Sequence, residues 1–372
     1  MMNHLRCRTC GQTYNPNEPV WRCTCGGLLD LHFQAEFPLD RIQARPPDLW
    51  RYREALPLES DDHIIIIALG EGFTPLLPVW IGDKSIWIKQ EHLFPTGSYK
   101  DRGAAMLISK SAELGISRVV EDSSGNAGCA VAAYCARAGM ECDIYVPADT
   151  SAAKLAQIQM YGATLHKIAG SREDTARAVL MAAEQYYYAS HSWNPFFFHG
   201  TKTFAYEVCE QLGWTAPDTI ILPVGNGTLL LGVDIGMSEL RNAGIIPQKP
   251  KLIAVQAAHC SPLAQRFFKP DSEITSPQPT IAEGIAIAEP IRGEQILDAV
   301  RNSGGTFITV SEDEIKTALI QMGTQGFYIE PTAAATIAGI QRYLATAPPD
   351  EVIVSVFTGH GLKATEKILK FL

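Results

Sequence analysis

Short runs of β-branched and apolar residues alternate with longer stretches of helical spacing through most of the chain after residue 110. The short runs predict strands at 118–120, 142–146, 163–168, 219–222, 251–255, 306–310 and 352–357. The longer stretches predict helices at 127–138, 151–161, 173–187, 203–212, 312–325 and 332–344. Strands that alternate with helices form parallel sheets covered on both faces. We therefore predict an α/β fold with two lobes of parallel sheet flanked by helices.

Composition and charge narrow the class of protein. The chain has 372 residues, of which 46% are hydrophobic and 19% charged, enough to bury a large core. Its net charge of -9 and pI near 5.5 argue against nucleic acid as a partner. The longest apolar run, Ile64 to Leu69, is too short to span a bilayer, and no apolar signal-peptide core appears near the N-terminus. We expect a globular cytoplasmic protein with no membrane partner.

Four of the nine cysteines cluster near the N-terminus as Cys7-x2-Cys10 and Cys23-x-Cys25. The segment around them, 1–35, has too little hydrophobic content to fold on a core of its own. Four thiolates around Zn²⁺ would supply that folding energy, and such a closed site is structural rather than catalytic. Because a single residue separates Cys23 from Cys25, a ribbon that has lost its metal is the open alternative. The other cysteines lie in apolar or helical segments, as in a reducing cytoplasm.

The segment Pro95 to Gly103 places Lys100 between a turn-forming Pro-Thr-Gly and the start of an apolar helix. A lysine amine that is buried at a helix start, beside other basic groups, loses its proton more easily and can form a Schiff base with an aldehyde cofactor. The alternative is an exposed lysine at the start of a helix. The first interpretation makes Lys100 a candidate nucleophile.

Three loops follow predicted strands, where α/β folds bind their ligands. The first, Ser123-Ser124-Gly125-Asn126, opens a helix whose N–H groups could hold a carboxylate, although Ser and Asn are also ordinary N-cap residues. The second, Gly225-Asn226-Gly227-Thr228, suits a phosphate nest, and it lacks the spacing of the dinucleotide and Walker motifs. The third places the neutral hydroxyl of Thr358 at a strand end.

Four motifs, taken in order, resemble those of pyridoxal-phosphate (PLP) enzymes of fold type II, the tryptophan synthase β superfamily, and most closely its threonine synthase group. The motifs are Leu69 to Leu76, Pro95 to Gly103, Ser123 to Asn126 and Thr358 to Lys363. The resemblance runs from the cysteine ribbon to the last helix and implies pyridoxal 5'-phosphate as the cofactor. With it we expect a large PLP-binding lobe of 36–104 and 201–372, a small lobe of 105–200, and a homodimer.

The resemblance also implies a role for each candidate residue. Lys100 carries the cofactor as a Schiff base and moves protons, Asn126 bonds the phenolic oxygen of the cofactor, and Thr358 faces its pyridine nitrogen. The substrate carboxylate falls to Ser123, Ser124 and Gly125, with Asn126 and Ala127 beside them in the substrate site. The cofactor phosphate falls to Gly225, Asn226, Gly227 and Thr228. A hydroxyl cannot hold the pyridine nitrogen protonated, so elimination suits such a ring better than extended carbanion chemistry. Glu283 lies either near the cofactor or on the surface.

The chain departs from threonine synthases where those enzymes bind the phosphate of their substrate. Ala127 stands at the position of a threonine in the substrate site, Phe197 replaces an arginine, and His191 replaces an asparagine. The second asparagine of the family's cofactor-phosphate loop falls at Leu229. A dianionic phosphate would be left largely unpaired, at a cost of several kcal/mol, unless Ser192, Lys202 or His191 compensates.

These observations predict a PLP-dependent carbon–oxygen or carbon–nitrogen lyase of the threonine synthase-like group. It would eliminate or replace a leaving group on a small amino acid of the threonine or serine type. One alternative is threonine synthase itself, acting on O-phosphohomoserine. The other is a non-catalytic PLP-binding protein, and the presence of Lys100, Asn126 and Thr358 argues against it.

Overall fold

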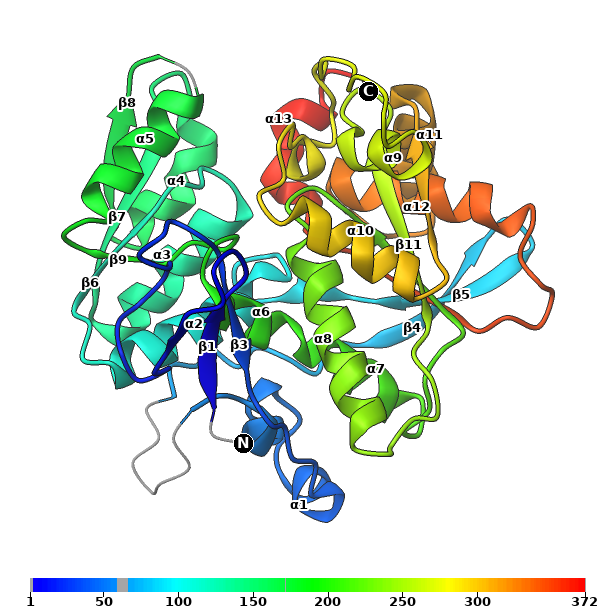
Figure 1. The fold of residues 1–372 in the computed structure, drawn as a ribbon. Coiled ribbons are helices and arrows are strands. Elements are labelled where there is room, and N and C mark those ends of the chain that lie inside the picture. The colour runs from blue at the N-terminus through cyan, green and yellow to red at the C-terminus, as the bar shows by residue number, and fades with distance from the viewer. Residues whose placement is uncertain (1–2, 59–65, 171, 372) are drawn as a thin grey trace. The chain divides into compact units, whose positions relative to one another are not determined.

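The computed structural model describes residues 3–58, 66–170 and 172–371. The chain divides into two compact units, each made of two stretches of sequence (Figure 1). Unit 1 comprises Met1–Phe73 and Lys100–Thr203, and unit 2 comprises Thr74–Tyr99 and Phe204–Leu372. The division differs from the expected lobes mainly because 36–73 belongs to the same unit as 100–203.

The main sheet of unit 1 has four parallel strands in the order β8-β7-β6-β9. Figure 1 draws these strands in blue-green to green. Its strands are β6 Arg118–Glu121, β7 Glu141–Pro147, β8 Thr164–Ile168 and β9 Tyr187–Tyr188. The helices of this unit are α2 Lys100–Glu113, α3 Asn126–Ala138, α4 Ala152–Met160, α5 Arg172–Ala182 and α6 Pro195–Thr201. The alternation of strands with helices confirms the predicted α/β class for this half of the chain.

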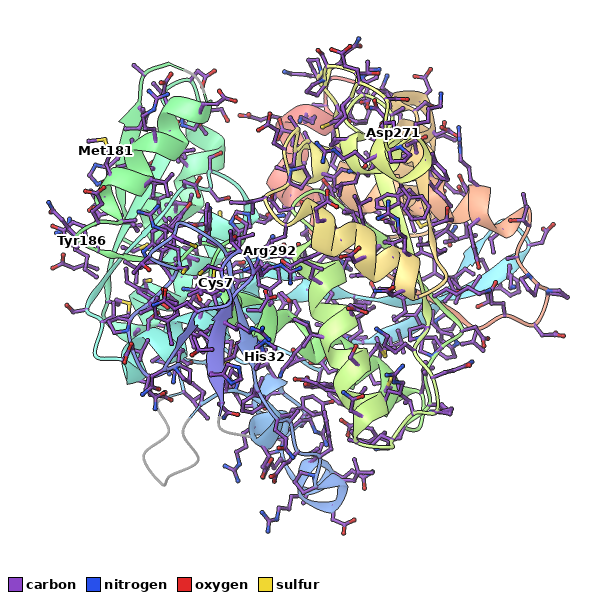
Figure 2. All side chains as sticks on the ribbon, in the orientation of Figure 1. Cys7, His32, Met181, Tyr186, Asp271 and Arg292 are labelled. Atoms are coloured by element: carbon purple, nitrogen blue, oxygen red, sulfur yellow. The ribbon has the colours of Figure 1, made fainter. Side chains whose placement is uncertain are left out.

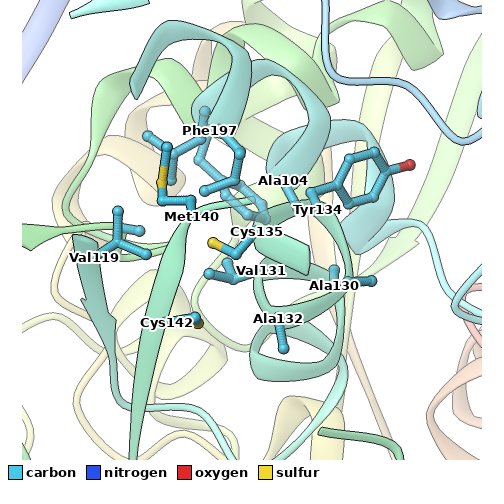
Figure 3. Close-up of a cluster of buried hydrophobic side chains, with 14 of the residues drawn as sticks. Ala104, Val119, Ala130, Val131, Ala132, Tyr134, Cys135, Met140, Cys142 and Phe197 are labelled. Carbon is cyan, nitrogen blue, oxygen red and sulfur yellow. The ribbon is translucent and has the colours of Figure 1, made fainter. Parts of the chain in front are cut away.

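The core of unit 1 depends on small residues that let helices approach closely. Helix α2 packs against both α3 and α6, and α3 packs against β7. Figure 3 shows the resulting cluster, in which Val131 of α3 and Phe197 of α6 lie among side chains from α2, β6 and β7. Helix α3 ends where Gly139 adopts a left-handed conformation (φ 67°), which glycine takes without steric cost.

A small antiparallel sheet forms the N-terminal ribbon, with strand order β2-β1-β3. Its strands are β1 His4–Cys7, β2 Thr13–Tyr14 and β3 Leu29–His32. Only four buried residues form its apolar cluster: Leu5, Cys7, Cys23 and Leu29. The short helices α1 Leu39–Ala44 and η1 Leu49–Ala55 follow. So small a core agrees with the expectation that this segment needs a further source of folding energy.

The sheet of unit 2 has six strands in the order β12-β11-β10-β13-β5-β4, and only β4 runs antiparallel to its neighbour. The strands are β4 Leu76–Ile81, β5 Lys84–Lys89, β10 Thr219–Pro223, β11 Lys251–Ala257, β12 Thr306–Val310 and β13 Ile353–Val356. Strands β10 and β13 are buried along their whole length, as expected for a parallel sheet covered on both faces.

The helices of unit 2 cover this sheet, and α12 contacts β10, β11, β12 and β13. The longer ones are α7 Thr203–Gln211, α8 Thr228–Asn242, α9 Pro262–Phe268, α10 Gly293–Asn302, α11 Glu312–Thr324 and α12 Pro331–Leu344. The shorter ones are η2 Glu91–Leu93, η3 Glu283–Ile285, η4 Gly361–Ala364 and α13 Thr365–Ile368. Ser311 and Glu314 form a capping box that fixes the start of α11.

The secondary structure differs from the sequence-based prediction in several places. The helix predicted at 173–187 is wrong beyond Ala182, because α5 ends there and Tyr187–Tyr188 form the buried strand β9. The β4–β5 hairpin was not predicted, nor were α8 and α10. The hairpin turns at Gly82, which has a positive φ of 61°. A Gly-Asp pair between two apolar runs was the sequence signal for this turn.

Among the described residues, no helix is long and apolar enough to cross a membrane. The apolar run Ile64 to Leu69 begins within 59–65, which lies outside the described residues.

Candidate active site

Lys100 is the first residue of α2, and its side chain is only partly exposed. Its Nζ lies 5.6 Å from the centre of the Phe197 ring, within cation–π range. The lysine therefore starts a buried helix, as predicted, and an aromatic ring from α6 limits where its amine can lie.

Phe197 itself is fully buried, and Gly103 makes room for it. A Cβ added at Gly103 would lie 2.1 Å from Cε1 of the Phe197 ring, so no larger residue fits at this position of α2 without moving the ring. Gly200 of α6 approaches α2 in the same way, since its Cβ would lie 2.0 Å from the Arg102 carbonyl oxygen. The position that holds an arginine in the resembled family is thus part of the apolar core.

A buried carboxyl group at the end of β6 was not recognised from the sequence. Glu121 is 0% exposed, and its Oε1 lies 2.7 Å from Nδ1 of His191. Burial raises the pKa of Glu121 to about 8, against the opposing effects of the Asp122 and His191 backbone amides and the Lys100 charge. The carboxyl therefore holds its proton near neutral pH, and the effect of the Lys100 charge on its pKa shows that Glu121 belongs to the surroundings of the lysine.

The loop Ser123 to Gly125 leads directly into α3, whose first residue is Asn126. The N-cap is Gly125, and no side chain caps this helix, so the alternative that Ser123 or Asn126 is an ordinary N-cap is wrong. Gly128 holds the loop close, because a Cβ there would lie 1.8 Å from the Ser123 carbonyl oxygen. The first turn of a 13-residue helix thus opens beside this loop, and its N-cap residue is a glycine that supplies no side-chain cap.

The residues at or near the positions where the resembled family binds substrate phosphate are mostly buried or paired with neighbours within unit 1. Ala127 is buried, with 2% of its surface exposed. Lys202 is fully buried, and its Nζ lies 4.9 Å from the ring centre of Phe33. The Ser192 hydroxyl lies 3.3 Å from that of Ser190. His191 is the member of this group that shares an aromatic neighbour, Phe197, with Lys100.

In unit 2, the loop Gly225 to Gly227 precedes the 15-residue helix α8. A Cβ at Gly225 would lie 3.0 Å from Cα of Ile285, and one at Gly227 would lie 2.3 Å from Cδ1 of Ile296. Gly227 is also the N-cap of α8 and adopts a left-handed conformation (φ 70°). Both positions require glycine, and the backbone N–H groups of the loop lie at a helix N-terminus, as in anion sites.

Tyr99, the residue before Lys100, joins this loop to the end of β13. Its hydroxyl lies 3.2 Å from that of Thr228, and its backbone N–H donates to the Thr358 carbonyl at 3.1 Å. Two of the loops predicted to form one site therefore share a neighbour within unit 2.

Thr358 has a side-chain partner that the sequence did not indicate. Its hydroxyl donates to Oε1 of Glu330 at 3.1 Å, and the Glu330 carboxylate also fills the space over Gly359. Glu330 is the N-cap of α12. Because the hydroxyl donates its proton to a carboxylate, its oxygen can accept a hydrogen bond from a further group.

Glu283 lies on the surface. Its carboxylate is 50% exposed and pairs with Lys367 at 2.5 Å. The backbone beside it, at Gly284 and Ile285, packs against Gly225. The surface interpretation of this side chain is confirmed.

The four N-terminal cysteines come together as expected, and all four sulfur atoms lie within 4.8 Å of one another. Sγ of Cys7 lies 3.6 Å from that of Cys25, and Sγ of Cys10 lies 3.5 Å from that of Cys23. Burial opposes ionisation of Cys23, but hydrogen bonds from Tyr14 and from the Cys25 backbone lower its pKa to about 6. Figure 2 labels Cys7 at the ribbon.

A surface cavity of about 280 Å³ lies elsewhere in unit 1, lined by residues that include Arg118, Glu141 and Thr164. These three residues begin β6, β7 and β8. Ligands of parallel α/β sheets bind at the opposite, carboxyl ends of the strands, where Glu121 and the Ser123 loop lie. The cavity is therefore not the candidate active site.

Comparisons with known proteins identify the family of the chain. The family model described as pyridoxal-phosphate dependent enzyme matches residues 67–359. A threonine synthase of Methanocaldococcus jannaschii is 36% identical over 383 residues, which cover 98% of this chain and 94% of that protein.

Two solved structures also resemble the chain. One is the processed form of threonine deaminase isoform 2 from Solanum lycopersicum, with a TM-score of 0.70 at 22% identity, covering 80% of this chain and 82% of that one. The other is the serine racemase of Dictyostelium discoideum, with a TM-score of 0.65 at 28% identity, covering 78% and 92%.

Proposed function

The chain belongs to the pyridoxal-phosphate-dependent enzymes of fold type II, and from this we propose that it is a lyase acting on a small, unphosphorylated amino acid. The reaction would remove or replace a hydroxyl or activated leaving group, as on serine or threonine. When bound, the cofactor withdraws electrons from the α-carbon of an attached amino acid, so that a neighbouring substituent can leave.

The residues of the chain fit that cofactor. Gly225 and Gly227 leave a backbone cradle that a side chain would fill, at the N-terminus of a long helix, which suits the cofactor phosphate. The hydroxyl of Ser98, two residues before Lys100, is fully buried and finds no hydrogen-bond partner within the described part of the chain. Buried hydroxyls without a partner are rare, which supports a bound group here.

We assign the roles accordingly. Lys100 holds the cofactor covalently and takes the proton from the α-carbon of the substrate. Asn126 binds the cofactor's phenolic oxygen, and Asn226 and Thr228 complete the phosphate loop. Thr358 binds the pyridine nitrogen. Because its hydroxyl donates to Glu330, it would meet that nitrogen as an acceptor.

Ser123, Ser124 and Gly125 would receive the substrate carboxylate. Their loop opens the 13-residue helix α3 without a side-chain cap, so the first N–H groups of the helix are suited to an anion.

The choice of an unphosphorylated substrate rests on the burial of Phe197. The family's phosphate-binding arginine is replaced by a ring that is 0% exposed and packed on Gly103, and Ala127 offers no hydroxyl. A phosphate beside these groups would lose its water without gaining matching donors.

Threonine synthase is the second candidate, because a threonine synthase shares 36% identity with nearly the whole chain. The deciding measurement is kcat/KM for L-threonine, L-serine and O-phosphohomoserine on one preparation, with release of ammonia and keto acid recorded. We expect a higher kcat/KM for L-threonine and L-serine than for O-phosphohomoserine. A preference for O-phosphohomoserine by more than about tenfold, roughly 1.4 kcal/mol in transition-state binding, would make the second candidate the function.

We further propose that Cys7, Cys10, Cys23 and Cys25 hold a structural Zn²⁺ ion, since their sulfur atoms converge and the ribbon has a very small core. None of the nine cysteines forms a disulfide, which supports a reducing, cytoplasmic location. A homodimer is the proposed assembly, and light scattering would test it.

A further inference from the structure

Glu121 and His191 form a buried acid–imidazole pair that the roles assigned above do not use. Oε1 of Glu121 lies 2.7 Å from Nδ1 of His191, while Oε2 is buried and has no hydrogen-bond partner within the described residues. Glu121 is 0% exposed, and the side chain of His191 is 12% exposed. A carboxyl group without full hydrogen bonding is costly to bury, so its retention beside the catalytic lysine calls for a reason.

The pair belongs to the surroundings of Lys100. The His191 ring meets the Phe197 ring nearly edge-on, with centres 6.2 Å apart, and Lys100 Nζ lies 5.6 Å from the same ring. Glu121 interacts electrostatically with Lys100. Because Nδ1 of His191 bonds to Glu121, Nε2 lies on the opposite side of the imidazole, and Glu121 sets which ring nitrogen carries the proton.

Elimination at a hydroxyl creates a demand for a proton that elimination of phosphate does not. Hydroxide leaves poorly and needs a proton as the carbon–oxygen bond breaks, whereas phosphate or chloride leaves as a stable anion. His191 places an imidazole, which can donate a proton, at the position where the resembled family has an asparagine. The same site lacks the donors that would bind a phosphate.

We infer that His191 protonates the leaving hydroxyl of the substrate and that Glu121 positions and recharges it. This inference rests on the proposed function. In the step, Lys100 takes the α-proton, and the electron pair released forms the double bond between the α- and β-carbons. The β-carbon–oxygen bond breaks, its electron pair goes to oxygen, and the proton on Nε2 of His191 completes a water molecule. As Nε2 gives up its proton, the Glu121 carboxyl passes its own proton to Nδ1, so His191 stays neutral and Glu121 is left as a carboxylate. Solvent then returns a proton to Nε2, and Nδ1 gives its proton back to Glu121.

The charges around the pair are consistent with this role. Glu121 faces Lys100, Asp122, Tyr188 and His191, and the Tyr188 hydroxyl donates to Asp122 at 2.8 Å. Burial raises the pKa of Tyr188 well above its usual value, and the Asp122 and Glu121 carboxyls add to the effect. Tyr188 therefore stays neutral, and the 2.7 Å hydrogen bond between Glu121 and His191 is the path by which the pair can pass a proton.

The decisive experiment compares two leaving groups on the holoenzyme. His191→Asn keeps a polar side chain of the family's type but cannot deliver a proton. We expect kcat with L-serine to fall by about 100-fold and kcat with β-chloro-L-alanine to stay within about threefold, because chloride needs no proton. His166→Asn is the matched control, since His166 bonds Asp143 at 2.7 Å in the same unit, and it should leave both substrates unaffected.

Glu121→Gln gives a second test that does not depend on turnover. Exchange of the imidazole C2 hydrogen, followed by mass spectrometry, reports the protonation of each histidine against pH. We expect the exchange midpoint of His191 to move by about one pH unit in Glu121→Gln while that of His166 is unchanged. An unchanged His191 midpoint would overturn the positioning role of Glu121.

The outcomes separate this inference from the proposed function. If the wild-type enzyme releases keto acid from neither L-serine nor β-chloro-L-alanine, the proposed function fails, and the inference with it. If the wild type acts on both and His191→Asn slows both equally, the function stands and proton delivery by His191 is wrong.

Discussion

Replacing Gly103 with alanine tests the contact that buries Phe197 beside Lys100. The new Cβ would lie 2.1, 2.2 and 2.5 Å from Cε1, Cδ1 and Cζ of the ring, where ordinary contact begins at 3.4 Å. The ring or helix α2 must therefore move by about 1.3 Å, the difference between 3.4 and 2.1 Å. Phe197 is 0% exposed, so the ring cannot turn into solvent.

The size of the effect follows from two opposing terms. Overpacking a closed core costs about 1–3 kcal/mol, and alanine in place of glycine inside a helix returns at most about 1 kcal/mol. We expect Gly103→Ala to destabilise the protein by about 1–2 kcal/mol, which lowers Tm by at least about 2 °C for units of this size. Because Lys100 lies over the same ring, cofactor occupancy should fall too.

Thermal unfolding followed by circular dichroism, with cofactor absorbance on the same samples, measures both effects. Gly323→Ala is the matched control, because Gly323 lies in helix α11 and a Cβ there meets nothing within 4 Å. The double variant Gly103→Ala, Phe197→Leu should recover part of the loss by making space. If Gly103→Ala melts at or above the wild-type temperature, the close packing described here is not rigid and the burial argument against substrate phosphate loses its support.

Three further predictions concern the cofactor, the ribbon and Glu121. Borohydride reduction should fix a cofactor adduct on Lys100 of the wild type, located by peptide mapping, and Lys100→Ala should lose this adduct. An adduct that forms equally in the variant would contradict the assignment. Elemental analysis should find one zinc per chain, and both a chelator and Cys10→Ser should lower Tm. A metal-free protein with an unchanged Tm in chelator would show that the ribbon holds no zinc. Burial raises the pKa of Glu121 to about 8 from an ordinary 4.5, so its protonated form stabilises the folded state at low pH, and this contribution is lost as pH rises from about 4.5 through 8. Denaturant unfolding at about pH 5, 6.5 and 9 should show wild-type stability falling relative to Glu121→Gln, and parallel curves would contradict it.

Much of the fold and the position of the loops could be predicted from local signals. Apolar residues that recur every two or every 3.6 positions indicated most of the strands and helices, because each period reports which face of an element is buried. The glycines at 225 and 227 and the lysine at 100 stood out because their chemistry is needed at a strand-to-helix junction. The edge hairpin β4–β5 was missed because the exposed positions of β4, such as Leu77 and Trp80, are apolar too, so no alternation of apolar and polar residues marks the strand.

The sequence by itself determined the α/β class, the four-cysteine ribbon and the candidate lysine, since each depends on residues close together in the chain. Only the tertiary structure decided what surrounds that lysine. Glu121 and His191 are 70 positions apart, Gly103 contacts Phe197 from another helix, and Thr358 bonds Glu330 across 28 positions. A glutamate at a strand end is usually exposed, so the sequence gives no reason to expect it buried. Its burial depends on helices packed from distant segments, and no local periodicity encodes which distant side chains they bring together.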